Sequence, residues 1–297
     1  MTASTPSPLR RSPVLLACAA ALLLTASASA DTSFLVNDTF TGGLNADTTA
    51  YPRWMTGANQ LTYSSPSDNL AITSGAGNGT TNNLSARLFT QTTLGVGDVL
   101  TLSYDFTSNN STATTIYRCG LYDLGTSTVT DGSLLAGSTT KAGYYSFYDN
   151  NAASGGTLAA VLRRESIASS TTTVEGSAPN TLLGSTATIA NIGTTTRSVV
   201  FSITNLGGGV TSITSTLYSA AGGGGSALYS LSGTDNSGLT TFDSLFLLTP
   251  AGTTVTYDNI QVALTTAVPE PGTTAALVGG FGLIAAIGLR RKRSAGR

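Results

Sequence analysis

The period of the hydrophobic pattern is the feature that most constrains what this chain can fold into. Residues 99–108 read VLTLSYDFTS, in which every even position from 100 to 106 is apolar and the positions between them are polar. Successive side chains of a β-strand point to opposite faces, so this alternation predicts a strand with one buried face. Residues 197–205 repeat the pattern and residues 213–217 continue it, with Gly207-Gly208-Gly209 between them as a hairpin loop.

Further short runs of β-branched and aromatic residues, separated by Gly, Asn, Asp and Ser clusters, predict more antiparallel strands. The apolar parity changes at Asp258-Asn259, which predicts a β-bulge there. About ten to fourteen strands fit the spacings, so we expect positions 31–264 to form one all-β, two-sheet antiparallel sandwich. A β-solenoid is the alternative, although no fixed repeat period supports it. The additional strand candidates are residues 114–121, 143–148, 157–163, 242–248 and 255–262.

Charge is segregated along the sequence. Of the 14 Lys and Arg residues, 7 lie in the two terminal segments, so residues 31–268 hold 7 basic and 14 acidic residues and a formal charge of −7. An acidic body without a basic patch argues against binding to nucleic acid or to anionic lipid headgroups. The sequence contains no histidine, which excludes Ser-His-Asp and Cys-His catalysis and every His-based metal site.

The remaining candidates for catalysis are carboxylates. A retaining glycosidase needs two of them about 5 Å apart, but Glu165 and Glu175 are separated by ten residues that include a Ser/Thr-rich stretch. We therefore expect no enzyme activity. Cys18 lies in the N-terminal segment, which leaves Cys119 as the only cysteine of the body. Cys119 is expected to be a small buried residue. Gly222–Gly225 is expected to form a flexible loop.

One stretch, residues 144–151 (YYSFYDNN), is a candidate for ligand binding. The rings of Tyr144, Tyr145 and Tyr148 can stack on sugars, and Asp149 and Asn150 can orient hydroxyl groups or hold calcium. The alternative is a strand with half of its aromatic residues buried, followed by an Asp-Asn-Asn turn. Both interpretations remain open. Calcium is the only cofactor that the Asp/Asn-rich loops suggest, and no spaced motif for a metal is present.

The N-terminus has the features of a signal peptide. Arg10 and Arg11 precede an apolar run over residues 14–24, and small residues Ala28 and Ala30 occupy the positions that a signal peptidase reads. We expect cleavage after Ala30, so that residues 1–30 are removed. A lipoprotein signal at Cys18 is the alternative, but the apolar run continues for six residues beyond that cysteine.

The C-terminus contains a second apolar segment. Residues 273–289 carry no charge, follow Val268-Pro269-Glu270-Pro271 and precede Arg290-Arg291-Lys292-Arg293. At 1.5 Å per residue the run reaches about 25 Å, just short of the ~30 Å hydrocarbon core of a bilayer. Basic residues stay on the cytoplasmic side during insertion. The pattern predicts a transmembrane helix over residues 273–289 with a basic stop over residues 290–297, although a buried core helix or a permanent anchor also fits the apolar run.

Pro-Glu-Pro, a Gly-rich apolar run and a terminal basic cluster, in this order, resemble the PEP-CTERM sorting signal of exported bacterial proteins. The resemblance covers residues 265–297, about a tenth of the chain. It implies that an exosortase recognises Glu270 and processes the tail. The protein would then be anchored in the inner membrane for a time and finally reside in the cell envelope, on the outer surface or in the extracellular matrix.

The ends of the body carry a second resemblance. Asn37-Asp38-Thr39-Phe40 with Trp54, and the closing residues 255–262 (VTYDNIQV), look like the first and last strands of concanavalin A-like, LamG-type jelly rolls. In such folds the two terminal segments often pair. The function expected from these observations is a non-enzymatic structural or adhesive role outside the cell. A carbohydrate-binding module acting on exopolysaccharide is the alternative, and a glycoside hydrolase or lyase is the least supported.

Overall fold

The computed structural model describes residues 30–40, 54–56, 61–64, 70–74, 83–109, 116–125, 141–149, 160–167, 180–186, 192–249 and 253–268. These segments carry fifteen β-strands, slightly more than the sequence pattern predicts. The strands are β1 Thr32–Asp38, β2 Met55–Thr56, β3 Leu61–Ser64, β4 Leu70–Ser74, β5 Asn83–Thr93, β6 Val99–Ser108, β7 Ile116–Asp123, β8 Lys141–Asp149, β9 Ala160–Ile167, β10 Asn180–Thr186, β11 Arg197–Gly207, β12 Val210–Tyr218, β13 Ala227–Asp235, β14 Thr241–Thr249 and β15 Thr254–Thr265.

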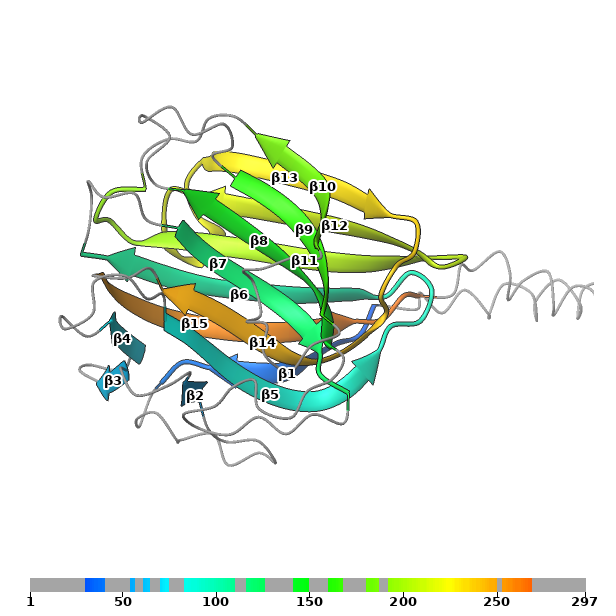
Figure 1. The fold of residues 1–297 in the computed structure, drawn as a ribbon, viewed down its shortest axis with the longest axis horizontal. Coiled ribbons are helices and arrows are strands. Elements are labelled where there is room, and N and C mark those ends of the chain that lie inside the picture. Colours follow the sequence, from blue (N-terminus) through cyan, green and yellow to red (C-terminus); the bar gives the residue numbers. More distant parts are fainter. Residues whose placement is uncertain are drawn as a thin grey trace, which may run out of the picture. The chain divides into compact units, whose positions relative to one another are not determined.

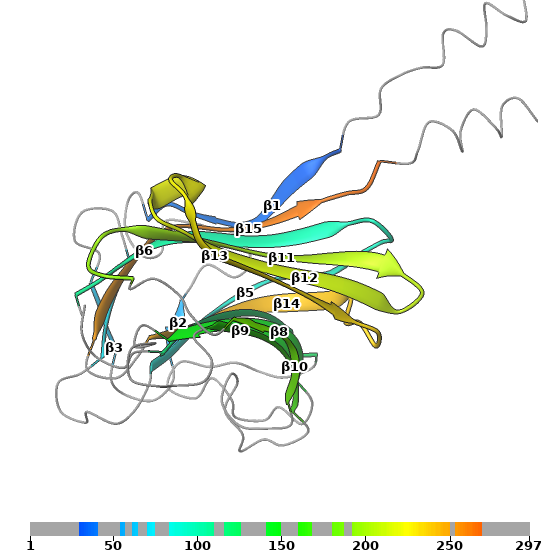
Figure 2. The ribbon, with the colours of Figure 1, turned by 90° about the horizontal axis from the view of Figure 1, so that it is seen from above.

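The strands form two antiparallel sheets that pack face to face (Figures 1 and 2). The eight-stranded sheet has the order β13-β12-β11-β6-β15-β4-β3, and β1 also pairs with β15. The seven-stranded sheet has the order β10-β9-β8-β7-β14-β5-β2. The chain passes between the sheets after β1, β2, β4, β5, β6, β10, β13 and β14, which gives a concanavalin A-like jelly roll. The predicted all-β, two-sheet antiparallel sandwich is confirmed.

The first and last strands of the sandwich lie side by side. β1 pairs antiparallel with β15, with Thr32 opposite Thr265 and Asp38 opposite Ile260. On its other side β15 pairs with β6, so the last strand occupies the interior of the eight-stranded sheet. The pairing of the terminal segments that the jelly-roll resemblance implies is therefore present.

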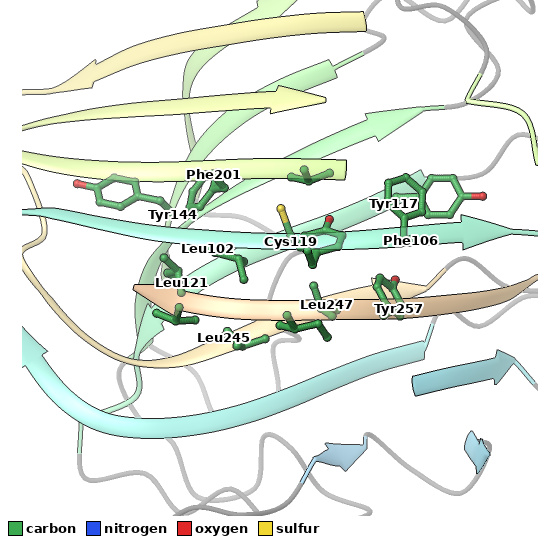
Figure 3. Close-up of a cluster of buried hydrophobic side chains, with 14 of the residues drawn as sticks. Leu102, Phe106, Tyr117, Cys119, Leu121, Tyr144, Phe201, Leu245, Leu247 and Tyr257 are labelled. Carbon is green, nitrogen blue, oxygen red and sulfur yellow. The ribbon is translucent and has the colours of Figure 1, made fainter. Parts of the chain in front are cut away.

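The alternation in β6 produces the predicted buried face. Tyr104 and Phe106 are buried between the sheets. The ring of Phe106 packs against those of Tyr117, Tyr148 and Tyr257, and the ring of Tyr104 packs against that of Tyr257, with centroids 5.5 to 6.5 Å apart. Figure 3 shows Phe106, Tyr117 and Tyr257 in this core. Tyr117 and Tyr148 stack at an interplanar angle of 15°. Edge and offset contacts of this kind add to the stability gained by burying large rings. We call these five residues the aromatic cluster.

Three further sequence predictions in the body are confirmed. Cys119 is buried in the same core (Figure 3). The register between β15 and β6 shifts between Asp258 and Gln261, and Asn259 has a φ of 51°, so the bulge lies where the apolar parity changes. The three glycines Gly207, Gly208 and Gly209 have positive φ and connect β11 to β12, because the left-handed backbone of this hairpin suits residues without a Cβ.

A buried carboxylate fastens the N-terminal strand to the opposite sheet. Asp38 accepts hydrogen bonds from the backbone N–H of Phe40 (3.1 Å) and from the indole Nε1 of Trp54 (2.9 Å). It also forms an ion pair with Arg87 of β5, and both side chains are buried. Removing one partner of such a pair leaves an uncompensated charge in the interior, typically at a cost of about 3–5 kcal/mol.

Candidate functional site

A pocket that includes several polar side chains lies on the outer face of the eight-stranded sheet. Its volume is about 460 Å³, and its walls come from the adjacent strands β15, β6 and β11 and from the loop between β12 and β13. None of the lining residues is basic. They are Thr101, Ser103, Tyr104, Asp105, Ser198, Val200, Gly222, Gly223, Asn259 and Gln261.

Asp105 of β6 is one of the residues that line the pocket. It follows the inward-pointing Tyr104, so the strand alternation turns its carboxylate to the outer face. One carboxylate oxygen accepts a hydrogen bond from the backbone N–H of Gly222 (2.7 Å), and the other accepts from Nδ2 of Asn259 (3.0 Å). Only 4% of the residue is exposed. Asp105 therefore joins the sheet, the bulge and the loop that together form the walls.

Asn259 reaches the pocket because of the β-bulge. Its φ of 51° lies in the left-handed region, which asparagine tolerates better than most residues. Its backbone N–H donates to the side chain of Asp258 (2.7 Å), and its amide donates to Asp105. Bulges redirect side chains away from the regular strand pattern. Asn259 remains exposed, so its amide forms part of the accessible pocket wall.

The loop between β12 and β13 covers one side of the pocket. It contains a short 3₁₀ turn, Ala221–Gly223, in which Gly222 and Gly223 have φ of 64° and 71°. These glycines direct two backbone N–H groups at the sheet, one to Asp105 and one to Oγ of Ser198 (2.9 Å). The sequence led us to expect a flexible loop at Gly222–Gly225. The expectation was incomplete, because two hydrogen bonds hold this segment against the sheet.

The pocket offers hydroxyl, amide and carboxylate groups in a small space. Thr101 and Ser103 contribute hydroxyl groups from β6, and Gln261 contributes an amide whose Nε2 donates to Asn37 (3.0 Å). Such groups pair with ligand hydroxyls as both donors and acceptors. With one carboxylate and no basic lining residue, the pocket favours a neutral polar ligand over an anion.

The three tyrosines that the sequence suggested for sugar stacking, Tyr144, Tyr145 and Tyr148, do not line this pocket. Tyr144 and Tyr148 project from β8 into the core between the sheets, and both are almost completely buried (Figure 3 shows Tyr144). Tyr145 points to the other side of the same sheet, where it packs in a second buried cluster with Tyr122 and Phe246. None of the three rings offers a face to a ligand. Sugar stacking was one of two interpretations of this stretch, and these three rings do not form such a surface because the strand is buried on both sides.

The hydroxyl group of Tyr144 connects the two sheets. It donates to Asp235 (2.7 Å), lies 2.8 Å from Oγ1 of Thr211 and accepts from the backbone N–H of Leu239 (2.7 Å). Burial raises the pKa of Tyr144 to about 12. The hydroxyl of Tyr148 lies 2.9 Å from that of Tyr104, which satisfies both groups in the core. Through these contacts the hydroxyl groups of Tyr144 and Tyr148 stabilise the core.

The other two residues of the predicted ligand-binding stretch, Asp149 and Asn150, lie wholly or partly outside the described residues. Neither the side chain of Asp149 nor any part of Asn150 is among the described residues. In the segments that are described, no group of three or more His, Cys, Asp and Glu side chains is placed to hold a metal ion. Calcium binding through these loops stays a prediction.

Glu165 has a defined environment on the outer face of the seven-stranded sheet. The hydroxyl of Tyr122 donates to its carboxylate (2.7 Å), and Glu165 is fully buried. Lys141 is buried nearby. Burial lowers the pKa of Lys141, and the charge of Glu165 opposes this shift. Glu175 lies outside the described residues, so the distance between the two glutamates is not defined.

The sorting residues fall almost entirely outside the described segments. Ala30 and Val268 are described, whereas Ala28, Pro269, Glu270, Pro271 and the basic residues 290–293 are not. Across the part of the chain that the structure covers, no helix has the length and hydrophobicity needed to cross a membrane. The predicted span, residues 273–289, is not in that part. Cleavage, insertion and processing therefore remain predictions.

Comparisons with known proteins identify similar folds only. No protein-family model matches the sequence, and no curated protein matches it. Solved structures that are similar include the metal-free carbohydrate recognition domain of Emp46p, with 10% identity, a TM-score of 0.48 and coverage of 79% of this chain and 97% of that chain. The CBM2 module of the evolved Dit of Lactobacillus casei BL23 phage J-1 is 8% identical, with a TM-score of 0.47 and coverage of 81% and 99%. The legume lectin-like domain from Entamoeba histolytica is 10% identical, with a TM-score of 0.41 and coverage of 72% and 90%. Similarities at this level carry no conclusion about this chain.

Proposed function

We propose that this protein is exported and that its β-sandwich binds a neutral glycan in the pocket formed by Asp105, Ser198, Gly222 and Asn259. The observation that carries the proposal is the pocket itself. It brings together a carboxylate, amide groups and hydroxyl groups in about 460 Å³ without a basic residue. Ligand sites typically enclose about 300–1,000 Å³, with a few polar groups that fix the orientation of the ligand.

The geometry of Asp105 and Asn259 supports recognition of hydroxyl groups. Because Asp105 is already held by Gly222 and Asn259, its orientation is fixed before a ligand arrives. Pre-organised polar groups lose little conformational entropy on binding. A sugar hydroxyl can donate to a carboxylate and accept from an amide at the same time. We therefore favour a neutral, hydroxyl-rich polymer such as an exopolysaccharide over an anionic one.

The export part of the proposal rests on the sequence signals at both ends. In this account a signal peptidase removes residues 1–30, and an exosortase recognises Val268-Pro269-Glu270-Pro271 and releases the tail. The mature protein then acts in the cell envelope or extracellular matrix as a non-enzymatic binding protein. We expect to find it outside the cytoplasmic membrane without residues 272–297. Intact tail on inner-membrane protein, in cells with a working exosortase, would contradict the sorting proposal.

Glycan binding can be tested with variants of the pocket that preserve the fold. Purified mature protein is titrated with neutral polysaccharides (dextran, mannan and galactan), with anionic alginate for comparison. We expect one or more neutral polymers to bind. Asn259→Gly should weaken the binding at least fivefold, because glycine keeps the left-handed backbone and removes only the amide. Thr216→Ala, on the same sheet face but outside the pocket, is the matched control. Absence of binding to every neutral polymer would leave a purely structural role.

A further inference from the structure

One end of the sandwich exposes large aliphatic side chains. Val96, in the turn between β5 and β6, is 69% exposed, and Leu206, next to the hairpin between β11 and β12, is 53% exposed. Both turns lie at the end of the sandwich where β15 finishes (Figures 1 and 2). Isolated exposed aliphatic residues are common on soluble proteins. What distinguishes these two is their position beside the point where the chain leaves the sandwich.

Hydrogen bonds and close contacts join the two turns to the end of β15. The N–H of Gly97 donates to the backbone oxygen of Asn205 (2.7 Å). The side chain of Val96 packs against Gly207, since a Cβ added to Gly207 would lie only 3.2 Å from Cγ1 of Val96. A Cβ built on Gly97 would lie 2.7 Å from Cβ of Ala267. We call the surface formed by Val96, Gly97, Leu206, Gly207 and Ala267 the apolar tip.

The apolar tip carries almost no charge. Within residues 94–98 and 205–210 the only ionisable side chain is Asp98. The carboxylate of Asp98 accepts hydrogen bonds from the backbone N–H groups of Gly95 and Ala267, both at 2.7 Å. An uncharged, aliphatic surface suits the interface of a bilayer, where apolar groups are buried near the headgroups. Without Lys or Arg, the contact does not depend on anionic lipids.

The short stretch of chain between the apolar tip and residue 273 limits how far the tip can be from the lipid surface in the anchored protein. Thr273, the first residue of the uncharged run, follows Ala267 by six positions. Six residues reach about 20 Å at full extension. While residues 273–289 span a bilayer, the apolar tip therefore stays within about that distance of the lipid surface.

We propose that the apolar tip docks on the lipid surface while the C-terminal tail is inserted. This inference rests on the proposed export route, since it requires the tail as the main anchor. Two aliphatic side chains give a weak contact that adds to an anchored chain but does not hold a free one. Docking of the tip keeps Val268-Pro269-Glu270-Pro271 close to the membrane surface, and removal of the tail releases the protein.

A fluorescence experiment tests this docking. Residues 31–297 are reconstituted into phosphatidylcholine vesicles with a single environment-sensitive label at Val96→Cys, Leu206→Cys or Ala227→Cys. Cys119 is buried and stays unlabelled in the folded protein. Ala227 is an exposed control at the start of β13, where it pairs with Tyr218 at the end of the hairpin remote from the tip. We expect spin-labelled lipid to quench the labels at positions 96 and 206 at least twofold more than the label at 227.

The outcomes separate this inference from the export route. Equal quenching at all three positions, in vesicles that carry the protein, would overturn docking and leave the anchoring tail intact. Failure of the protein to float with the vesicles would overturn the span over residues 273–289 and docking with it. A chain that ends at Val268 should lose the difference between the labels, because the weak contact then has no anchor.

Discussion

Consecutive residues of one strand belong to two different regions of this molecule. Tyr104 of β6 points into the aromatic cluster between the sheets, and Asp105 points outward to the pocket. The aromatic cluster is closed and its hydroxyl groups bond to one another or to neighbouring core groups. The pocket is open, and its groups come from strands β6, β11 and β15, including the bulge in β15, and from the glycine-rich loop between β12 and β13. Aromatic residues here stabilise the fold, while polar residues on the outer face of the sheet and the adjoining loop form the candidate binding site.

The largest expected effect comes from the aromatic cluster. Phe106→Ala should lower the free energy of unfolding by about 3–5 kcal/mol, because it removes ring contacts and leaves a cavity. Denaturant unfolding of the purified mature protein measures this change. At a temperature where the variant is still folded, its affinity for a neutral glycan should match that of the unchanged protein. A loss of affinity in the folded variant would mean that the two regions are coupled.

Asp105→Ala should affect both stability and binding. The N–H of Gly222 and the amide of Asn259 would lose their acceptor, so we expect a loss of about 1–3 kcal/mol in stability. Glycan affinity should fall at least tenfold, because the loop and the bulge lose their common anchor. Calorimetric titration and denaturant unfolding of the same preparation measure the two effects. Unchanged affinity would show that the pocket does not bind the glycan.

Asp243 carries an outward carboxylate that lies outside the pocket, and its titration should affect stability. Burial raises its pKa to about 6, although the N–H of Leu124 donates to it (3.0 Å) and opposes the shift. A raised pKa in the folded state means that stability present below pH 4 is lost as the pH rises through about 6. Asp243→Asn should therefore stabilise the protein by about 1 kcal/mol at pH 7.5, allowing for partial exposure, and have little effect at pH 4. Thermal unfolding of the variant and the unchanged protein at the two pH values measures this difference. An equal change in stability at both pH values would contradict the raised pKa of Asp243.

Tyr148→Phe should lower the free energy of unfolding by an amount similar to or smaller than the change expected for Asp243→Asn, and it should leave binding unaffected. It removes the hydroxyl that lies 2.9 Å from that of Tyr104 and keeps the ring in the aromatic cluster. The loss of one buried hydrogen bond is typically worth about 1 kcal/mol. Glycan binding should stay unchanged, as measured by the same titration. Reduced binding would restore the sugar-stacking hypothesis for residues 144–151.

Much of the fold could be predicted from the sequence because it depends on local periodicity. The bounds of β6 follow from the alternation in residues 99–108, and the bulge follows from the change of parity at Asp258-Asn259. Strands without strict alternation, such as β10 and β13, gave no comparable signal. The tyrosines of β8 show the limit of the pattern. Strand parity separates Tyr145 from Tyr144 and Tyr148, but it does not reveal that both faces of this strand are buried.

The pocket could not be predicted because its groups are distant in sequence. Asp105, Ser198, Gly222 and Asn259 become neighbours only through the sheet order β15-β6-β11 and the fold of the β12–β13 loop. Two local signals were available, the parity change at Asn259 and the glycine run at Gly222–Gly225. Each indicates an irregular backbone, and neither specifies that the two irregular segments meet at one carboxylate.

The most direct test of glycan binding in the pocket compares Asn259→Gly with Thr216→Ala in titrations with dextran, mannan and galactan. Thr216→Ala should change stability by no more than a few tenths of a kcal/mol, since Thr216 is a partly exposed surface residue. Asn259→Gly suits the φ of 51° but removes a hydrogen bond to the buried carboxylate of Asp105, so we expect it to lower stability by about 1 kcal/mol. We predict an affinity at least fivefold lower for Asn259→Gly and an unchanged affinity for Thr216→Ala. Equal affinities for the two variants would contradict the assignment of the pocket as the glycan site.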